Sequence, residues 1–453
     1  MANNPIVNMF KIKELRDRMF YTLIALAVFR LGTCLTIPGI NPGVLLDYFT
    51  KLAEQNSAEN SIASYLNFFA GGAFSNFSVF MLGVMPYIST QIIMQLALVI
   101  FPSLKRIAQE DGGQRKIQEW TRIGTVFVCI IQSFAVTVYA ANINQETLAQ
   151  NGVPTIMFDS FAFKLIAMLT VTTGSMITVW LGNQITARGI GNGISILIYA
   201  GIVARLPNAI MELWTTVRAS GNSGDIIKLI VVLVMFVCVI ALVVFEQSGE
   251  RKIPVHYAKR VVGRKMYGGQ NTYLPFKINP SGVIPIIFAS SFLTFPLQIA
   301  SSLGRNVRWL AKLSNILSPT GILYNVLLVL LIIFFAYFYT QVTLNPTEIA
   351  KNIRENGGSI PGIRTDRTEE YLQKVLNRLV LPGSLYLALI AVLPTVIQIF
   401  FKFPPSIAML MGGTSLMILV GVDLDTMSQV EALLKMHHQD GFSRKGKIRS
   451  RNL

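Results

Sequence analysis

Residues 71–96 read GGAFSNFSVFMLGVMPYISTQIIMQL and contain no Asp, Glu, Lys or Arg. About 20 apolar residues in a helix cross the ~30 Å hydrocarbon core of a bilayer. Inside lipid the backbone must satisfy its own hydrogen bonds, and the sequence lacks the alternating pattern of a membrane barrel. The stretch therefore predicts a transmembrane helix, which its glycine pair and Pro86 interrupt.

The composition of the whole chain agrees with a membrane protein. Of 453 residues, 52% are hydrophobic and 14% are charged, and the mean hydropathy is +0.52. Soluble domains carry about 25% charged residues, so this chain has too few to cover a water-soluble globule. Intrinsic disorder is excluded by the apolar content, and a disulfide scaffold by the presence of only three cysteines.

Apolar runs of spanning length recur along the chain and predict an all-α membrane protein with ten transmembrane helices. The runs are 19–37, 74–101, 120–141, 158–181, 194–213, 226–245, 280–303, 322–342, 379–401 and 408–430. The first follows a polar start and precedes no small-residue cleavage site, so we expect a retained span rather than a signal peptide. The count divides into two fives, and halves with five spans each are inverted if they are repeats. We place an N-terminal half at 1–213, a C-terminal half at 214–430 and a basic tail at 431–453.

The distribution of basic residues predicts the orientation. With these ten spans, the loops on the side of the N-terminus carry 29 Lys and Arg, and the opposite loops carry 6. Basic loops stay in the cytoplasm, so both termini are predicted to be cytoplasmic. Most of the net charge of +16 therefore reflects topology and attraction to anionic lipid.

Few ionisable residues fall within the predicted spans, and none forms a recognisable catalytic group. We expect Arg30 to extend its guanidinium to the membrane surface. Asp423 and Asp425 are interpreted as solvated acids near the end of a span, although a coupling carboxylate is the alternative. The adjacent His437 and His438 have no further ligand nearby. We predict no enzyme activity, no catalytic residue, no metal and no cofactor.

Glycine and proline break three of the spans at their starts. Besides residues 71–96, these are ITARGIGNGISI at 185–196 and NPSGVIPIIF at 279–288. The stretch SIASYLNFFAGGAF at 61–74 is apolar but too short to cross, which favours a re-entrant segment. Ordinary kinking is the alternative for each break.

Branched aliphatic residues flank these breaks and suggest a pore constriction. Val84 and Ile88 lie one helical turn apart, as do Ile190 and Ile194. A ring of aliphatic side chains in a pore excludes water and ions. A secondary transporter would instead carry polar or ionisable groups at its waist, and a membrane scaffold or insertase without a pore would not need the glycine breaks. The aliphatic pattern favours a channel.

Several longer stretches resemble the SecY family of bacterial protein-conducting channels, along nearly the whole chain. They are GVMPYIST (83–90), DGGQRKIQEWTRIGT (111–125), ITARGIGNGISILIYAGIV (185–203), VHYAKRVVGRKMYGGQNTYLPFKINPSGVIPIIFASS (255–291), NPTEIAKNIRENGGSIPGIR (345–364) and GGTSLMIL (412–419). The resemblance implies ten helices in two inverted halves around an hourglass pore.

The resemblance also implies roles for individual residues. The pore ring would comprise Val84, Ile88, Ile190, Ile194, Ile287 and Ile418. The plug would lie at about 64–74 and include Tyr65, Leu66, Asn67, Phe68 and Phe69. A lateral gate between the second and third helices and the seventh and eighth would include Ser89, Phe295 and, on a weaker match, Gln132.

Two large loops are candidate docking surfaces. Loop 246–279 has a net charge of +5, and its alternating Ile253, Val255 and Tyr257, followed by the Gly268-Gly269 pair, predict a β-hairpin with its turn at the glycines. By resemblance, its basic residues would face ribosomal RNA phosphates and the motor; these are Lys259, Arg260, Arg264 and Lys265. Loop 343–378 is nearly balanced in charge. There Arg364 matches a residue on which motor engagement depends, and Thr365-Asp366 replaces the usual Pro-Gly.

Taken together, the resemblance implies a passive channel that moves unfolded polypeptides across the bacterial plasma membrane and releases hydrophobic segments sideways into it. The implied partners are the SecE and SecG subunits, the SecA motor ATPase, the ribosome, signal-sequence-bearing precursors and membrane lipids.

Overall fold

The structure is a computed structural model of the 453-residue chain, and it describes residues 12–445 apart from short stretches. The stretches outside the description are 55–66, 68–69, 158–159, 221–222, 258–259, 263–264, 268–270, 304–308, 311, 313–315, 319–320 and 402–412. The chain divides into two units, which are described separately. The first holds 1–207, 298–311 and 421–453, and the second holds 208–297 and 312–420.

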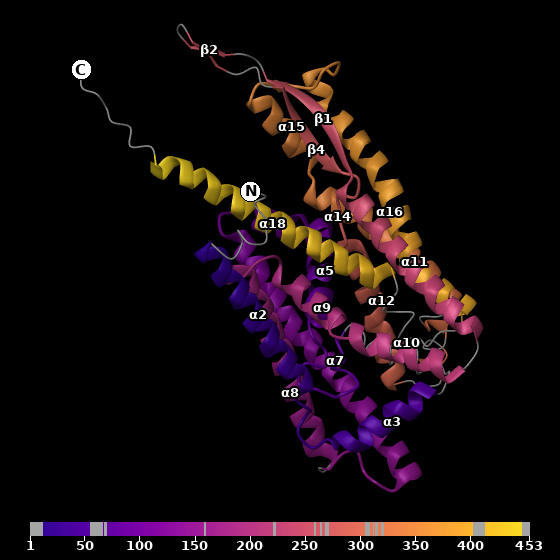
Figure 1. Cartoon of the computed structure of the whole chain (residues 1–453). Coiled ribbons are helices and arrows are strands. Elements are labelled where there is room, and N and C mark those ends of the chain that lie inside the picture. The colour runs from indigo at the N-terminus through magenta and orange to yellow at the C-terminus, as the bar shows by residue number, and fades with distance from the viewer. Residues whose placement is uncertain are drawn as a thin grey trace. The chain divides into compact units, whose positions relative to one another are not determined.

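The first unit is helical (Figure 1). Its helices are α2 (Lys13–Cys34), α3 (Pro42–Glu54), α5 (Met85–Ile100), α6 (Pro102–Gln109), α7 (Gly113–Asn151), α8 (Ser160–Arg188) and α9 (Gly193–Val203), with the last part of α18 (Gly413–Lys445). Helix α7 packs against α5 and α8, and α2 packs against α8 and α9. Helix α6 turns away from α5 by 103° at Phe101 and Pro102. Proline disfavours helical geometry in the residue before it, which explains a bend at this point.

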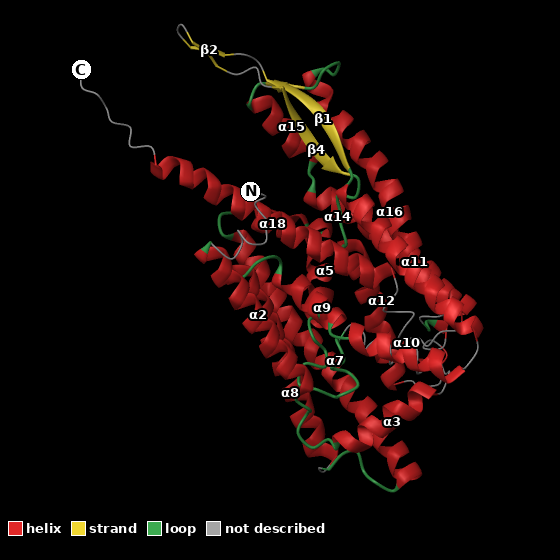
Figure 2. Ribbon diagram, viewed as in Figure 1, coloured by secondary structure: helices red, strands yellow, loops and turns green. Residues whose placement is uncertain are grey.

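The second unit combines helices with all the strands among the described residues (Figure 2). Its elements are α10 (Leu206–Ser220), α11 (Ser223–Ser248), β1 (Glu250–Tyr257), β2 (Arg260–Val262), β3 (Lys265–Tyr267), β4 (Asn271–Lys277), α12 (Ile284–Leu303), α14 (Ile322–Thr343), α15 (Pro346–Glu355), β5 (Gly358–Ser359), the 3-10 helix η1 (Thr365–Arg367), α16 (Thr368–Phe401) and the start of α18. Helices α14 and α16 pack against each other.

Four helices in the described part of the chain are long and apolar enough to cross a membrane, and the bent pair α5–α6 makes a fifth. The four are 113–149, 161–188, 322–355 and 365–393. Other predicted spans contain shorter apolar helices, at 193–208, 233–248 and 284–298. Glycine and proline shorten two of these at their starts, because both residues interrupt continuous helix.

The span predicted at 74–101 begins later than its hydropathy suggested. Residues 70–84 form successive turns, and the helix starts only at Met85, with Pro86 in its first turn. Gly71, Gly72 and Gly83 have φ of 62°, 94° and 55°, a region that glycine enters without steric cost. Proline is well tolerated in the first turn of a helix because its missing N–H has no partner there. The helix is therefore shorter than predicted, although its apolar run is continuous.

The predicted β-hairpin in loop 246–279 is confirmed, but its turn is placed differently. Strand β1 pairs antiparallel with β4 along its length, from Glu250 opposite Lys277 to His256 opposite Asn271. Beyond them β2 pairs with β3, with Val262 opposite Lys265. The chain therefore reverses between Val262 and Lys265, and the prediction that it turns at Gly268-Gly269 is wrong. The glycine pair lies between β3 and β4, outside the described residues.

Strand β5 joins the two large loops in one small domain, which we call the sheet domain (β1, β4, β5, α15 and the start of α16). It pairs with the end of β1, so that the order in the sheet is β4-β1-β5. The core of the domain is apolar and comprises Ile253, Val255, Phe276, Ala350, Ile353, Ile360, Leu372, Val375, Leu376 and Leu379. Burying each large aliphatic side chain contributes roughly 1.5–3 kcal/mol. The alternation that predicted the hairpin thus marks the side of β1 that faces this core.

Candidate functional site

The start of α5 presents the first two predicted ring residues. Val84 precedes the helix and Ile88 lies in its first turn, with 6% and 3% of their surfaces exposed. The hydroxyls nearby are satisfied within the helix, since Ser89 Oγ donates to the Met85 carbonyl at 3.1 Å and Thr90 Oγ1 to that of Pro86 at 2.8 Å. The polar groups at this helix start are thus held by the helix itself.

The glycine break between α8 and α9 is held by side chains from three other positions. The Gly191 N–H donates to Gln429 Oε1 at 2.9 Å, and the Gly193 N–H donates to Thr186 Oγ1 at 2.8 Å. Asn192 caps α9 by accepting from the N–H of Ile194 at 3.1 Å. A Cβ on Gly193 would collide with the Gly182 carbonyl oxygen, so only glycine fits there. The break is a built feature of the first unit rather than an accidental kink.

The two predicted ring residues at this break have different surroundings. Ile190 is 6% exposed and forms a small buried cluster with Leu15 of α2 and Val430 of α18. Its N–H donates to Thr22 Oγ1 of α2 at 3.3 Å. Ile194 lies in the first turn of α9 and is half-buried. The structure thus places Ile190 among residues of the two terminal helices of the first unit.

The remaining predicted ring residues belong to the second unit. Ile287 lies in the first turn of α12 and is half-buried, and Ile418 lies in the second turn of α18 with 1% of its surface exposed. Both therefore follow a helix start, as Ile88 does in the first unit.

Of the predicted plug, Tyr65, Leu66, Phe68 and Phe69 lie outside the described residues. Asn67 is described, and it ties the following turns together. Its carbonyl accepts from the Gly72 N–H at 3.0 Å, and its Oδ1 accepts from the Ser75 N–H at 3.0 Å. The end of the predicted plug and the turn that follows it are therefore linked by local hydrogen bonds.

Arg30 contacts this same segment, a contact that the sequence did not predict. Its guanidinium donates to the Gly71 carbonyl at 3.1 Å and is partly buried. Gly71 also approaches the backbone of α9, where a Cβ on Gly71 would lie 2.7 Å from the Gly201 Cα. A charged donor to a partly buried carbonyl forms a stronger hydrogen bond than a neutral one. Arg30 thus holds the end of the predicted plug within the first unit.

The predicted gate residues lie on three helices. Ser89 is on α5 and half-buried, Phe295 is on α12 and half-buried, and Gln132 is on α7 with 2% of its surface exposed. The Gln132 Oε1 is buried and has no hydrogen-bond partner among the described residues. A buried amide oxygen without a partner weakens the packing around it.

Three of the five predicted docking residues are described, and they lie near the middle of the two large loops. Arg260 is in β2 and Lys265 in β3, whereas Lys259 and Arg264 lie outside the described residues. Arg364 is exposed and precedes η1, where its carbonyl accepts from the Arg367 N–H at 2.9 Å. Thr365 and Asp366 form this short helix without the usual Pro-Gly. The tip around Arg364 thus keeps an ordered turn.

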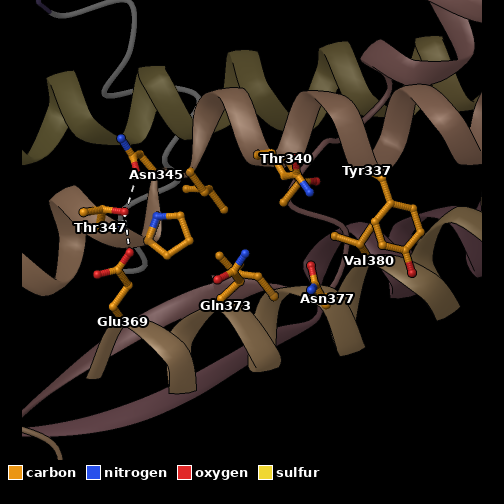
Figure 3. A pocket seen from close by; sticks show the side chains of 12 residues that line it. Tyr337, Thr340, Asn345, Thr347, Glu369, Gln373, Asn377 and Val380 are labelled. Atoms are coloured by element: carbon orange, nitrogen blue, oxygen red, sulfur yellow. Dashed lines mark hydrogen bonds between the residues drawn. The ribbon is translucent and has the colours of Figure 1, made fainter. Parts of the chain in front are cut away.

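A polar cavity of about 230 Å³ lies between α14, α15 and α16, at the side of the sheet domain (Figure 3). Its lining includes Gln341, Gln373 and Asn377, together with Glu369, which accepts a hydrogen bond from Thr347 Oγ1 at 2.8 Å. This volume is below that of most small-molecule sites. Among the described residues, no cluster of His, Cys, Asp or Glu could hold a metal ion.

Sequence reasoning missed the residues that position these features. Thr22, Thr186 and Gln429 fix the glycine break, and Arg30 holds the end of the predicted plug. The sequence offered one signal, because a lone arginine within a predicted span needs a partner. The three other side chains lie in α2, α8 and α18, and nothing in a single sequence relates them to the break.

Comparison with known proteins identifies the family. The SecY family model matches residues 78–427. The protein translocase subunit SecY of Escherichia coli K12 is 42% identical over 458 aligned positions, covering 99% of each chain. The chain belongs to the SecY family. It is the channel subunit of a protein translocase, a multi-pass membrane protein and a non-enzymatic pore.

Solved structures share the SecY channel fold. A protein-conducting channel matches with a TM-score of 0.63 at 18% identity, covering 94% of this chain and 96% of that one. Sec61 in the canine ribosome-channel complex from the endoplasmic reticulum matches with a TM-score of 0.59 at 17% identity, with the same coverage. At these identities the matches bear on the fold alone, and in the second case the channel is in complex with a ribosome.

Proposed function

We propose that this SecY chain forms a ten-helix channel in two inverted halves, at 1–213 and 214–430, in the bacterial plasma membrane with both termini in the cytoplasm. The excess of 29 basic residues over 6 between the two sets of loops supports the orientation. The breaks before α9 and α12 support spans that are interrupted near a pore rather than continuous.

The pore is sealed by an aliphatic ring. Its proposed members share one local feature, because each lies at or just after a helix start; they are Val84, Ile88, Ile194, Ile287 and Ile418. Contacts between aliphatic side chains are non-directional, and the ring can stretch around a passing chain and close behind it. Ile190, which packs with Leu15 and Val430, contributes least to the seal. Water leaves such a narrow aliphatic constriction, which blocks ions.

The plug at about 64–74 closes the outer funnel, and its turns are held by Arg30. The lateral gate parts near Ser89, Gln132 and Phe295, where a hydrophobic signal segment replaces the lost helix contacts. Interhelical hydrogen bonds within membranes are worth only about 1 kcal/mol, so a polar seam opens at low cost.

The sheet domain docks the partners that drive transport. The basic residues around β2 and β3 face ribosomal RNA phosphates, an electrostatic contact that salt weakens. Arg364 engages the SecA motor ATPase from its exposed turn. The apolar core of the sheet domain holds loops 246–279 and 343–378 together, which supports a single docking surface formed by both loops. The SecE and SecG subunits complete the complex around the channel.

The observation that carries this proposal is the buried aliphatic start of α5. Replacing Ile88 with Asn should raise the resting ion conductance of reconstituted complexes by at least about tenfold, because the closed ring loses roughly 1.5–3 kcal/mol of apolar burial. The matched control is Val99→Asn on the same helix, where the side chain is 54% exposed. Equal conductance in the two variants would remove Ile88 from the ring.

A further inference from the structure

Glu246 has a buried carboxyl group that plays no part in the transport mechanism proposed above. It is the first residue after the predicted span at 226–245 and lies near the end of α11. Only 7% of its surface is exposed, and both carboxylate oxygens are buried without a hydrogen bond of good geometry among the described residues. Glu250, four residues later, is exposed. A buried carboxylate without partners costs several kcal/mol, so this group needs a physical explanation.

The described residues that interact with Glu246 are polar and uncharged. Asn279, from the turn before α12, and Tyr386, from α16, face it. The hydroxyl of Tyr386 and the amide nitrogen of Gln247 are also buried without partners in the described part of the chain. Burial raises the pKa of Glu246 to about 7, and the Asn279 amide opposes that effect only in part. All these residues belong to the second unit.

Glu246 also lies where the sheet domain joins the start of α12. The Gly249 N–H donates to the Glu246 carbonyl at 3.2 Å, and the Ile278 N–H donates to the Gly249 carbonyl at 2.9 Å, so both ends of the domain meet at this point. Asn279 then fixes the turn into α12, because its Nδ2 donates to the Gly282 carbonyl at 3.1 Å. A change in the hydrogen bonds of Asn279 would therefore alter the turn at the start of α12.

We propose that Glu246 binds and releases a proton and thereby positions the turn that begins α12. In the neutral form a proton from water is bound to one carboxyl oxygen, and the uncharged group stays buried at low cost. When that proton returns to water, the carboxylate attracts the available donors, which are the Asn279 amide and the Tyr386 hydroxyl. Drawing Asn279 toward Glu246 weakens its bond to Gly282 and loosens the turn.

The consequence for transport rests on the proposed function, because α12 carries Ile287 and Phe295. Deprotonation would loosen the helix that contributes to both the ring and the gate. The chemistry of Glu246 can nevertheless be tested on a complex that translocates nothing.

The test is hydrogen–deuterium exchange of the reconstituted full-length complex across a pH series, corrected for intrinsic exchange rates. The reporters are the amides of Gly282, Ile286 and Ile287, which donate to Asn279 or Val283. Their protection should fall by roughly tenfold as the pH is raised through about 7. Glu246→Gln, which is fixed in the neutral form, should keep full protection throughout, and Glu250→Gln should behave as the wild type.

A second measurement does not depend on a variant that folds normally. Infrared titration of the wild-type complex should show one protonated carboxyl that is lost near pH 7, and this band should be absent in Glu246→Gln. The proposal is overturned if Glu246→Gln shows the same exchange step as the wild type. Loss of every carboxyl band near the ordinary glutamate pKa of 4.5 would also overturn it.

Discussion

Two interrupted helix starts, one in each unit, differ in how their polar groups are hydrogen-bonded. At the break before α9, the exposed backbone donors of Gly191 and Gly193 bond to Gln429 and Thr186. At the turn before α12, Asn279 satisfies Gly282, but a buried carboxyl next to it lacks a well-formed partner. A fully satisfied polar network rigidifies the structure around it, whereas a buried polar group left unpaired is costly. We infer that the first break is a fixed support and the second an adjustable one.

The largest loss of stability is expected from a substitution in the glycine break before α9, the fixed support. Gly193→Val places side-chain carbons where the Gly182 carbonyl oxygen lies, so the break cannot close. We expect a loss of about 4 kcal/mol or more in unfolding free energy, the range of severe backbone clashes. Thermal unfolding of the purified complex measures this. Gly43→Ala is the control, since a Cβ there meets only Asn41 Oδ1 at an ordinary 3.5 Å, and normal stability of Gly193→Val would contradict a fixed break.

The free energy of unfolding should depend on pH because of Glu246, which lies beside the turn before α12. The pKa of Glu246 is raised from 4.5 to about 7 in the folded protein. Its stabilising contribution is therefore complete below pH 4.5 and is lost as the pH rises to about 7. The lost amount is on the order of 3 kcal/mol. Unfolding midpoints of the wild type and Glu246→Gln should diverge over this pH range, with the wild type falling relative to the variant; parallel curves would contradict a buried titrating carboxyl.

The smallest loss of stability is expected when one hydrogen bond to the glycine break before α9 is removed. Gln429→Ala removes the acceptor for the Gly191 N–H, and Thr22 and Thr186 still hold the neighbouring residues. One hydrogen bond contributes about 1 kcal/mol. Chemical denaturation should detect this loss, with the exposed Met427→Ala on the same helix as the control. A loss as large as that of Gly193→Val would mean that the break depends on this one bond.

The sequence predicted those features that depend on local patterns. The alternation of Ile253, Val255 and Tyr257 predicted the hairpin, because a strand with one buried face repeats every two residues. Hydropathy failed at residues 74–84, since an apolar run has the same composition whether it forms helix or turns. The positive φ of Gly71, Gly72 and Gly83 decides between them. Length and apolar content alone therefore overestimated α5.

Non-local pairings could not be predicted from one sequence. Strand β5 has only two residues, and its pairing with β1 spans about a hundred positions along the chain. The contact between Arg30 and the Gly71 carbonyl depends on how α2 packs against the turns. In the sequence Glu246 resembles an ordinary loop residue, and only the structure shows that its side chain is buried. Roles for the ring and gate residues came from family motifs and stay predictions.

If an aliphatic ring seals the pore, its residues contact the translocating chain, and site-specific crosslinking detects that contact. A photoreactive residue is placed in turn at positions 88, 194, 287 and 418 of the full complex, with a precursor stalled during transport. Crosslinks to the precursor are expected from all four positions and none from position 127, where Phe127 is 65% exposed on α7. Crosslinks from position 127 but not from the four ring positions would contradict the proposed ring.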